Sequence, residues 1–242
     1  MNVDKNSYTF SFAIVMVIVV AGLLSFTAIN LKKPQLKNIE LEKKQNILSS
    51  IGINVERDQA GLNFDKYIKE KIVLNSSGEE VKGDAFKIDL SKELKKNKKD
   101  QLLPLYVAIV EGEKKYIIPL RGKGLWGPIW GFLSLENDFN TVYGAVFDHK
   151  SETPGLGAEI NQYEDFQQQF EGKQILEGAK VVSITVWKGG AKPDDVHGVD
   201  GISGGTITSD GVTYMLEERL NMYAPYFKNM LEQNKQITAS IK

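Results

Sequence analysis

The chain has 242 residues, a formal net charge of −1 and no cysteine. A protein of this length forms one sizeable domain, with room for a smaller subdomain. The nearly neutral charge argues against a nucleic-acid-binding protein, which would be basic. The lack of cysteine excludes disulfides, thiolate metal ligands and cysteinyl flavin links. The two histidines, His149 and His197, are far apart in sequence, which disfavours a histidine-rich metal site.

Residues 8–29 form an uncharged, mostly apolar run, YTFSFAIVMVIVVAGLLSFTAI. As a helix, a run of this length extends about 33 Å, enough to cross a hydrocarbon core of about 30 Å. A cleaved signal peptide has a shorter apolar region followed by a small-residue cleavage site, and residues 30–33 offer no such site. We therefore predict an N-terminal membrane anchor, residues 1–30, that is retained and contacts membrane lipid.

The charges beside the apolar run favour one orientation in the membrane. Only Lys5 precedes the run, whereas five lysines follow it closely: Lys32, Lys33, Lys37, Lys43 and Lys44. Positive charge is retained on the cytoplasmic side of membranes. Taken alone, this pattern places the C-terminal domain in the cytoplasm.

Residues 31–100 are predicted to contain a juxtamembrane helix and a variable segment. Residues 31–58 read as a polar helix with scattered apolar residues that ends near Gly52. Residues 59–100 are rich in lysine and poorly patterned. Within them, residues 91–100 are typical of a solvated loop or a short exposed helix.

From residue 101 the pattern favours strands. Residues 105–110 and 116–120 read as one hairpin, and residues 129–135 and 141–147 as a second. Residues 162–170 are predicted as a helix and 181–187 as a strand rich in β-branched residues. Hairpins with separate helices predict an α+β domain over residues 101–233, with a mixed, largely antiparallel sheet and flanking helices. Residues 234–242 are predicted to be a frayed tail.

The most informative stretch is DGISGGTITS, residues 200–209. Its adjacent glycines, Gly204 and Gly205, can bring backbone N–H groups close to a ligand. A predicted helix over residues 210–223 follows, capped by Thr208 or Ser209 and broken at Pro225 into a second short helix. Its apolar face is made of Val212, Met215, Leu216, Leu220 and Tyr223. Free N–H groups and the positive end of the helix dipole favour an anion there. The stretch is interpreted as a phosphate-binding loop; a simply capped helix after a tight turn is the alternative.

Two further stretches carry motifs, GKGLW at residues 122–126 and ETPGLG at 152–157. The tryptophans are expected to lie in the core, because large aromatic side chains dominate protein interiors. Pro154-Gly155 predicts a type II turn. Glu152 and His149 suggest acid–base chemistry, but no serine or cysteine nucleophile with a paired base is discernible, which disfavours a hydrolase.

In that order behind one membrane span, the three motifs resemble those of the single-span FMN-binding subunit of the Na+-translocating NADH:quinone oxidoreductase. Asp200-x-x-Ser203-Gly204-Gly205-Thr206 resembles the flavinylation motif Asp-x-x-Ser/Thr-Gly-Ala-Thr, in which the last threonine is esterified to the phosphate of FMN. A flavin transferase performs that step with FAD as donor. Gly205 stands where the motif has alanine. The equivalent FMN-binding subunit of the ferredoxin-linked ion-translocating electron-transport complex carries the same domain and is the alternative family. The longer segment after the span favours the quinone-reductase family.

The resemblance implies that residues 101–233 form an FMN-binding domain and that Thr206 is the covalent attachment point. Residues expected near the phosphate are Ser203, Gly204, Gly205, Ile207 and Thr208. Residues expected to shape the ribityl and ring pocket are Glu152, Thr153, Leu156 and Gly157, with Trp126 for ring packing and Lys188 for charge near the flavin.

The function implied by the resemblance is that of a one-electron relay. It lies between NADH and quinone in a membrane complex that exports Na+, is not catalytic alone, and works with other subunits and a flavin transferase. The resemblance also implies a single-pass protein of the bacterial inner membrane with its FMN domain in the periplasm, in conflict with the lysine count. A membrane-anchored binding module without a redox role is the remaining alternative.

Overall fold

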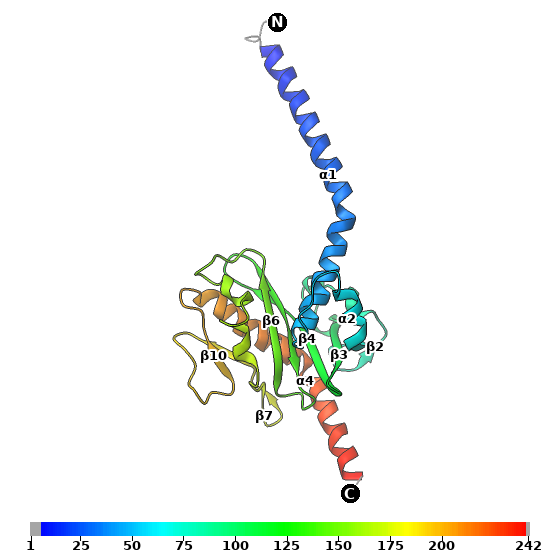
Figure 1. Ribbon diagram of the computed structural model, residues 1–242, viewed down its shortest axis with the longest axis vertical. Coiled ribbons are helices and arrows are strands. Elements are labelled where there is room, and N and C mark those ends of the chain that lie inside the picture. The colour runs from blue at the N-terminus through cyan, green and yellow to red at the C-terminus, as the bar shows by residue number, and fades with distance from the viewer. Residues whose placement is uncertain (1–5, 241–242) are drawn as a thin grey trace. The chain divides into compact units, whose positions relative to one another are not determined.

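The computed structural model describes residues 6–240, and the side chains of residues 6–233. Contacts within the chain divide it into two compact units, with the boundary in the sequence between Lys43 and Lys44. The first contains most of helix α1 (Asn6–Ser49), and the second contains every strand of the described residues (Figure 1).

Helix α1 joins the predicted span and the predicted juxtamembrane helix in one element of 44 residues. Among the described residues it is the one helix that is long and apolar enough to cross a membrane. Its apolar side chains from Phe10 to Leu31 are exposed, as a lipid-facing surface requires. Pro34 lies inside the helix without ending it, and the helix ends at Ser49, close to the predicted limit. Lys5, used in the charge argument, lies outside the described residues.

The second unit is built on a six-stranded antiparallel sheet with the order β2-β1-β3-β4-β5-β6. The strands are β1 (Ile68–Leu74), β2 (Glu80–Val81), β3 (Leu103–Val110), β4 (Glu113–Lys123), β5 (Pro128–Leu135) and β6 (Val142–His149). Both predicted hairpins and the α+β class are confirmed. Strand β1 was not predicted, because its exposed Lys69, Glu70 and Lys71 interrupt the alternation that marks a half-buried strand. The sheet therefore begins before residue 101.

Both faces of the sheet are buried. In β3, Leu105 and Val107 belong to one core, and Tyr106 and Ala108 belong to the other. The first core is closed by helix α4 (Thr206–Ser240), which lies across the sheet in Figure 1. The second core is closed by residues 47–51 and by helix α2 (Ala60–Tyr67). The shorter helices are η1 (Ala85–Lys87), α3 (Leu90–Glu93) and η2 (Lys98–Asp100); the last two overlap the predicted loop or short helix at residues 91–100.

Helix α4 buries the predicted apolar face, from Val212 to Tyr223. The hydroxyl of Tyr223 donates to the carbonyl of Pro104, with 2.7 Å between the oxygens. The prediction that Pro225 breaks the helix in two is wrong, because the buried side chains of Tyr226 and Phe227 anchor the next turn and keep the helix continuous. The helix continues through Ser240, which includes most of the segment expected to fray; residues 241–242 lie outside the described residues.

Between β6 and α4 the chain is irregular, with η3 (Ala158–Asn161), η4 (Gln167–Phe170), β7 (Leu176–Glu177), β8 (Lys180–Val181), β9 (Thr185–Trp187) and β10 (Gly198–Asp200). The helix predicted for residues 162–170 is wrong: only its last four residues form a 3₁₀ turn, held where Phe166 and Phe170 pack on Phe147. The strand predicted for residues 181–187 is divided into β8 and β9. Ser183 has a φ of +67°, which interrupts the extended chain.

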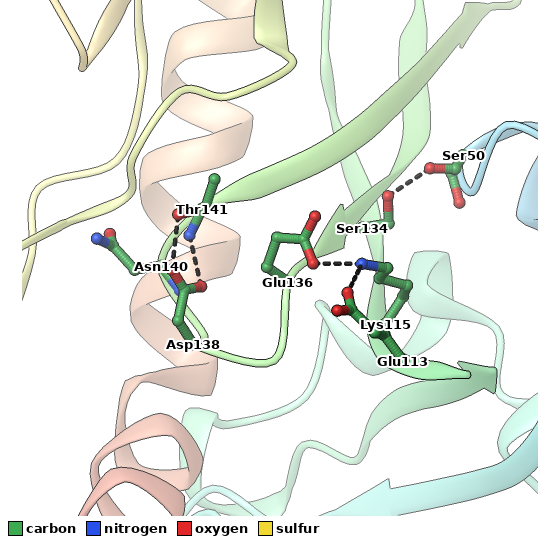
Figure 2. A network of polar contacts seen from close by, with 8 residues as sticks. All are labelled: Ser50, Glu113, Lys115, Ser134, Glu136, Asp138, Asn140 and Thr141. Atoms are coloured by element: carbon green, nitrogen blue, oxygen red, sulfur yellow. Dashed lines mark hydrogen bonds and ion pairs between the residues drawn. The ribbon is translucent and has the colours of Figure 1, made fainter. Parts of the chain in front are cut away.

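One end of the sheet is held by a polar network around the β5–β6 turn (Figure 2). Asp138 accepts hydrogen bonds from the backbone and the hydroxyl of Thr141, at 2.8 and 2.6 Å. The buried ammonium of Lys115 forms ion pairs with Glu136 and Glu113. The network thus orders the β5–β6 turn. The β4–β5 turn lies at the opposite end of strand β5.

A first prediction concerns the packing of β5 on β6. At Gly131 a side-chain Cβ would lie 2.1 Å from the carbonyl oxygen of Val146, so there is no room for alanine. We expect Gly131→Ala to lower the free energy of unfolding by about 2–4 kcal/mol. At Gly61, in α2, a Cβ would meet nothing within 4 Å, and Gly61→Ala should raise stability by up to about 1 kcal/mol. Urea unfolding of the detergent-solubilised protein measures both; equal stabilities would contradict this packing.

Candidate functional site

Three segments that are far apart in sequence leave the sheet at the same end. The register pairs Lys123 with Pro128 and Ile129 with His149. The β4–β5 turn, residues 124–127, and the loop after β6, residues 150–157, therefore begin side by side. Gly211, in the second turn of α4, lies against the first of these: a Cβ there would be 2.4 Å from the carbonyl oxygen of Lys123. The three motifs thus converge on one end of the hairpin.

The carboxylate of Glu152 joins these segments. It accepts a hydrogen bond from the hydroxyl of Thr208, at 2.7 Å, and from the backbone N–H groups of Trp126 and Leu125, at 3.0 and 3.3 Å. The residue is only 5% exposed. Burial by itself would raise the pKa of Glu152, but the hydrogen bonds from Thr208 and the backbone outweigh it, so the pKa lies below its ordinary value. The carboxylate is charged at neutral pH; it belongs to the ETPGLG motif and accepts hydrogen bonds from the other two motifs.

Glycines allow two of the loops to touch. A Cβ at Gly204 would lie 2.5 Å from the carbonyl oxygen of Gly155, and a Cβ at Gly157 would lie 2.3 Å from the Thr208 hydroxyl. Both residues have positive φ, +81° and +136°. A Cβ at Gly205 would lie 3.1 Å from the Cα of Gly157. The glycine at position 205, where the flavinylation motif has alanine, therefore permits a closer approach of the two loops.

Thr206 is the first residue of α4, four positions earlier than the predicted start of the helix. The prediction of Thr208 or Ser209 as the N-cap is wrong, because the turn of Gly204-Gly205 already starts the helix: the carbonyl of Gly205 accepts from the N–H of Ser209 at 2.9 Å. The backbone N–H groups of the first turn have no acceptor within the helix. The half-buried side chain of Thr206 thus lies at the end of α4 that favours an anion.

The ETPGLG loop forms the predicted tight turn. The N–H of Leu156 donates to the carbonyl of Thr153 at 2.9 Å, and Gly155 has a φ of +77°, as a type II turn requires. Glu159 accepts from the N–H groups of Gly155 and Gly157. The hydrogen bond from Gly155 lowers the pKa of the Glu159 carboxyl despite its partial burial. Sequence reasoning missed Glu159, whose signal is an acid directly after a glycine turn.

The expectation that the tryptophans lie in the core is wrong. Trp126 is 64% exposed, Trp187 is 46% exposed and Trp130 is half-buried. Trp126 lies in the β4–β5 turn, where its backbone N–H donates to Glu152 and its side chain is left largely exposed. Leu156 and Ile207 are also exposed. Each of the three motifs thus presents an exposed apolar side chain, and those of Leu156 and Ile207 belong to the two segments that meet at the start of α4.

Lys188 follows β9, which pairs in parallel with β10. The N–H of Gly201 donates to the carbonyl of Trp187 at 2.8 Å, so Lys188 is brought to the start of the glycine loop, with its side chain exposed. His149 does not pair with the carboxylate of Glu152; its Nδ1 accepts the backbone N–H of that residue at 3.1 Å. The acid–base pair suggested by the sequence is therefore not formed.

A cavity of about 510 Å³ lies beside the site, between the β4–β5 turn and the first turns of α4. Lys123 and Leu125 line it from the turn, and Ile207 and Tyr214 line it from the helix. Tyr214 was not a predicted site residue. Its place in the cavity lining becomes clear only from the structure, in which α4 begins at Thr206.

Residues 124–221 match the FMN-binding domain family. The NqrC subunit of the Na(+)-translocating NADH-quinone reductase of Vibrio anguillarum is 32% identical over 233 residues, which cover 89% of this chain and 91% of that protein. The chain belongs to the NqrC family. The predicted family is thereby confirmed, and the chain is the FMN-binding NqrC subunit of a Na+-translocating NADH-quinone reductase, a complex of several subunits.

Two crystal structures support the fold of this NqrC chain. NqrC of the Na(+)-translocating NADH-quinone reductase from Parabacteroides distasonis is 44% identical with a TM-score of 0.76, and the match covers 81% of this chain and 96% of that one. NqrC from Shewanella oneidensis is 26% identical with a TM-score of 0.66, and the match covers 81% and 98%. The six-stranded sheet with flanking helices is the fold of the family.

A second prediction concerns the Glu152 hydrogen bonds. Glu152→Gln replaces a charged acceptor by an amide and leaves one buried donor without a partner, so it should lower the free energy of unfolding at neutral pH by about 1–3 kcal/mol. The folded-state pKa of Glu152 lies below the ordinary value of about 4.3, so its stabilisation is complete above that pH and is lost as the pH falls towards the folded-state value.

The difference between wild type and Glu152→Gln should therefore shrink as the pH falls below the ordinary value of about 4.3 and towards the lower folded-state pKa. Urea unfolding at a series of pH values measures it. Glu164→Gln, at an exposed position of the same chain, is the control and should leave stability within about 0.5 kcal/mol. A constant difference between the variants across this pH range would contradict the role given to Glu152.

Proposed function

We propose that Thr206 carries FMN through a phosphoester bond and that the chain relays electrons from NADH towards quinone within the sodium-exporting complex. The observation that carries this proposal is the position of Thr206. It is the first residue of α4, beside the Gly204-Gly205 turn, and the ETPGLG loop packs against that turn. Resemblance of residues 200–206 to the flavinylation motif supports the same residue.

The residues present fit a phosphate ester at this position. Gly204, Gly205 and Gly157 leave no side chains between the loops, so the backbone itself faces the start of α4. The unpaired N–H groups of the first turn and the helix dipole would offset phosphate charge, each exposed interaction contributing about 0.3–1 kcal/mol. Ser203, which is exposed, and Ile207 flank the acceptor hydroxyl. Thr208 is already bonded to Glu152, so it serves as a support and is not the acceptor.

The rest of the cofactor would meet the exposed side chains around this point. Leu156, Ile207 and Trp126 offer apolar surface for the ring system, and aromatic packing suits a flat ring. Thr153 and Gly157 belong to the turn that borders the glycine loop. Glu152 would act indirectly, by holding the backbone of Trp126 and the hydroxyl of Thr208 in place through hydrogen bonds. Lys188 would supply positive charge from the side of β9.

Attachment requires a flavin transferase and FAD. The Thr206 oxygen forms a bond to the FMN phosphorus, the pyrophosphate bond of FAD breaks, AMP leaves and the hydroxyl proton is released. A covalent link keeps the carrier loaded without reliance on a binding equilibrium. FMN supplies the ability to accept and donate single electrons; the chain holds, orients and partly shields it.

The chain is an electron relay and not a complete enzyme. The exposed ring of apolar side chains around Thr206 would face the other subunits, which deliver and remove electrons. Residues 8–29 contain no carboxylate, so the sodium path lies in other subunits. Residues 1–30 would anchor the chain in lipid as a single span, followed by the segment to residue 100 and the FMN-binding domain over 101–233, to whose sheet β1 and β2 of the preceding segment also belong. The agreement of this last range with the family match over residues 124–221 supports it.

The FMN domain would lie in the periplasm of a bacterium, outside the inner membrane. The lysines after the span argue for the opposite orientation, but Glu40 and Glu42 accompany them and partner subunits also determine topology. Resemblance to a family matured by a periplasmic flavin transferase is the stronger argument.

A third prediction tests the attachment point. Co-expressed with a flavin transferase, the wild-type protein should gain the mass of FMN less one water, and Thr206→Ala should gain nothing. Thr206→Ser should retain some modification because it keeps a hydroxyl, and Ser203→Ala should retain it fully. Intact-mass spectrometry measures all four. The proposal would be contradicted if Thr206→Ala were modified. It would also be contradicted if the wild type stayed unmodified by a transferase shown to be active on another substrate.

A fourth prediction tests the orientation. A reporter enzyme that is active only in the periplasm, fused after Lys242, should be active in intact cells. Deletion of residues 8–29 should abolish that activity while leaving the fusion protein present. Activity of a cytoplasm-specific reporter at the same position would reverse the assignment.

A further inference from the structure

Arg219, on α4, is a buried cation with unused donors. Its side chain is 4% exposed, yet its Nε and Nη1 have no hydrogen-bond partner among the described residues. Its Nη2 is paired only with the carboxylate of the neighbouring Glu218, which is itself 65% exposed. Buried polar groups nearly always have partners, so unpaired donors on a buried guanidinium call for a physical explanation.

A cavity of about 800 Å³ lies at this position, between α4 and the segment that leads into β3. Arg219 lines it, together with the apolar side chains of Leu94, Leu103 and Met222. Cavities that hold small organic molecules are of this size, mostly apolar, with a few polar groups that orient the ligand. This space, called here the Arg219 cavity, combines such apolar side chains with Arg219 and a rim of further polar and charged side chains.

The charges around the Arg219 cavity favour an anion at the guanidinium. Lys96 and Lys98 also line it, and Lys96 is already paired with Glu93 at 2.8 Å. The acids in the lining are Glu217 and Glu218, and both are exposed to water. If the carboxylate of a ligand replaced Glu218 as the partner of Arg219, the Glu218 side chain would remain solvated. The deepest charge is therefore positive, and a guanidinium is shaped to bind a carboxylate.

We propose that the Arg219 cavity binds a small organic anion whose carboxylate pairs with Arg219 and whose apolar part packs against Leu94, Leu103 and Met222. The site is separate from the FMN site: neither Thr206 nor any residue of the ETPGLG loop lines it. It adjoins that site, because Tyr214 and Glu218 line both this cavity and the one beside the β4–β5 turn. The occupant would thus contact the helix that begins at Thr206.

The test uses the full chain in detergent and three probes, benzoate, benzamide and inorganic phosphate. Benzamide keeps the shape of benzoate without the charge, and phosphate keeps a charge without the apolar part. Isothermal titration calorimetry gives the affinities for the wild type, for Arg219→Met and for Arg219→Lys. Lys228→Met removes a cation from an exposed position of the same helix and is the matched control. Met222→Trp fills the cavity from its apolar side and keeps the test decisive if an Arg219 variant fails to fold.

We expect benzoate to bind the wild type at least tenfold more tightly than either benzamide or phosphate. Arg219→Met and Met222→Trp should each weaken benzoate binding at least tenfold, Arg219→Lys should weaken it less, and Lys228→Met should leave it unchanged. Thr206→Ala should also bind normally, which separates this proposal from that of FMN attachment. Equal affinity for benzoate and benzamide, phosphate binding as tight as benzoate, undiminished binding to folded Arg219→Met, or no binding to the folded wild type would overturn it.

Discussion

The carboxylate of Glu152 is the interaction on which the rest of the site depends. It accepts hydrogen bonds from the β4–β5 turn and from the first turn of α4, and it is itself part of the loop after β6. Burying a carboxylate is costly unless its oxygens are hydrogen-bonded, and here two donors come from the β4–β5 turn and one from the first turn of α4. Loss of either partner segment would leave the buried carboxylate with fewer donors, so Glu152 couples the β4–β5 turn to the start of α4 and hence to the position of Thr206.

Close approach of backbones is the second requirement, and glycine provides it. Gly204 faces Gly155, and Gly157 faces Thr208, with no space for a Cβ at either contact. The two loops therefore form one surface at the positive end of a helix, where unpaired N–H groups favour a phosphate. Because the chain belongs to the FMN-binding NqrC family, this surface is the candidate site for FMN. The exposed side chains of Trp126 and Leu156, from the other two motifs, offer apolar contacts for a cofactor or a neighbouring protein of the complex.

Local patterns predicted the hairpins of β3–β4 and β5–β6 and the apolar face of α4, because alternation and helical spacing are visible in short windows. They failed where tertiary contacts decide: the charged first half of β1 joins the sheet, Ser183 divides a predicted strand, and Pro225 is held inside a helix by its buried neighbours. Resemblance to a family predicted Thr206 and Glu152 as site residues, but only the structure shows the bond between Glu152 and Thr208, which are 56 residues apart. Sequence periodicity carries no information about such a contact, and it gave no sign of Glu159 or Arg219.

The central claim, that Thr206 holds FMN, is tested most directly on the chain isolated from its native membranes. Proteolysis and fragment-ion mass spectrometry of the fluorescent peptide would locate the flavin. The account predicts a single modified peptide that spans residues 203–208, with the fragment series placing the added mass on Thr206. Flavin mass on Ser203 or Thr208, or flavin that is released intact when the protein is unfolded, would contradict it.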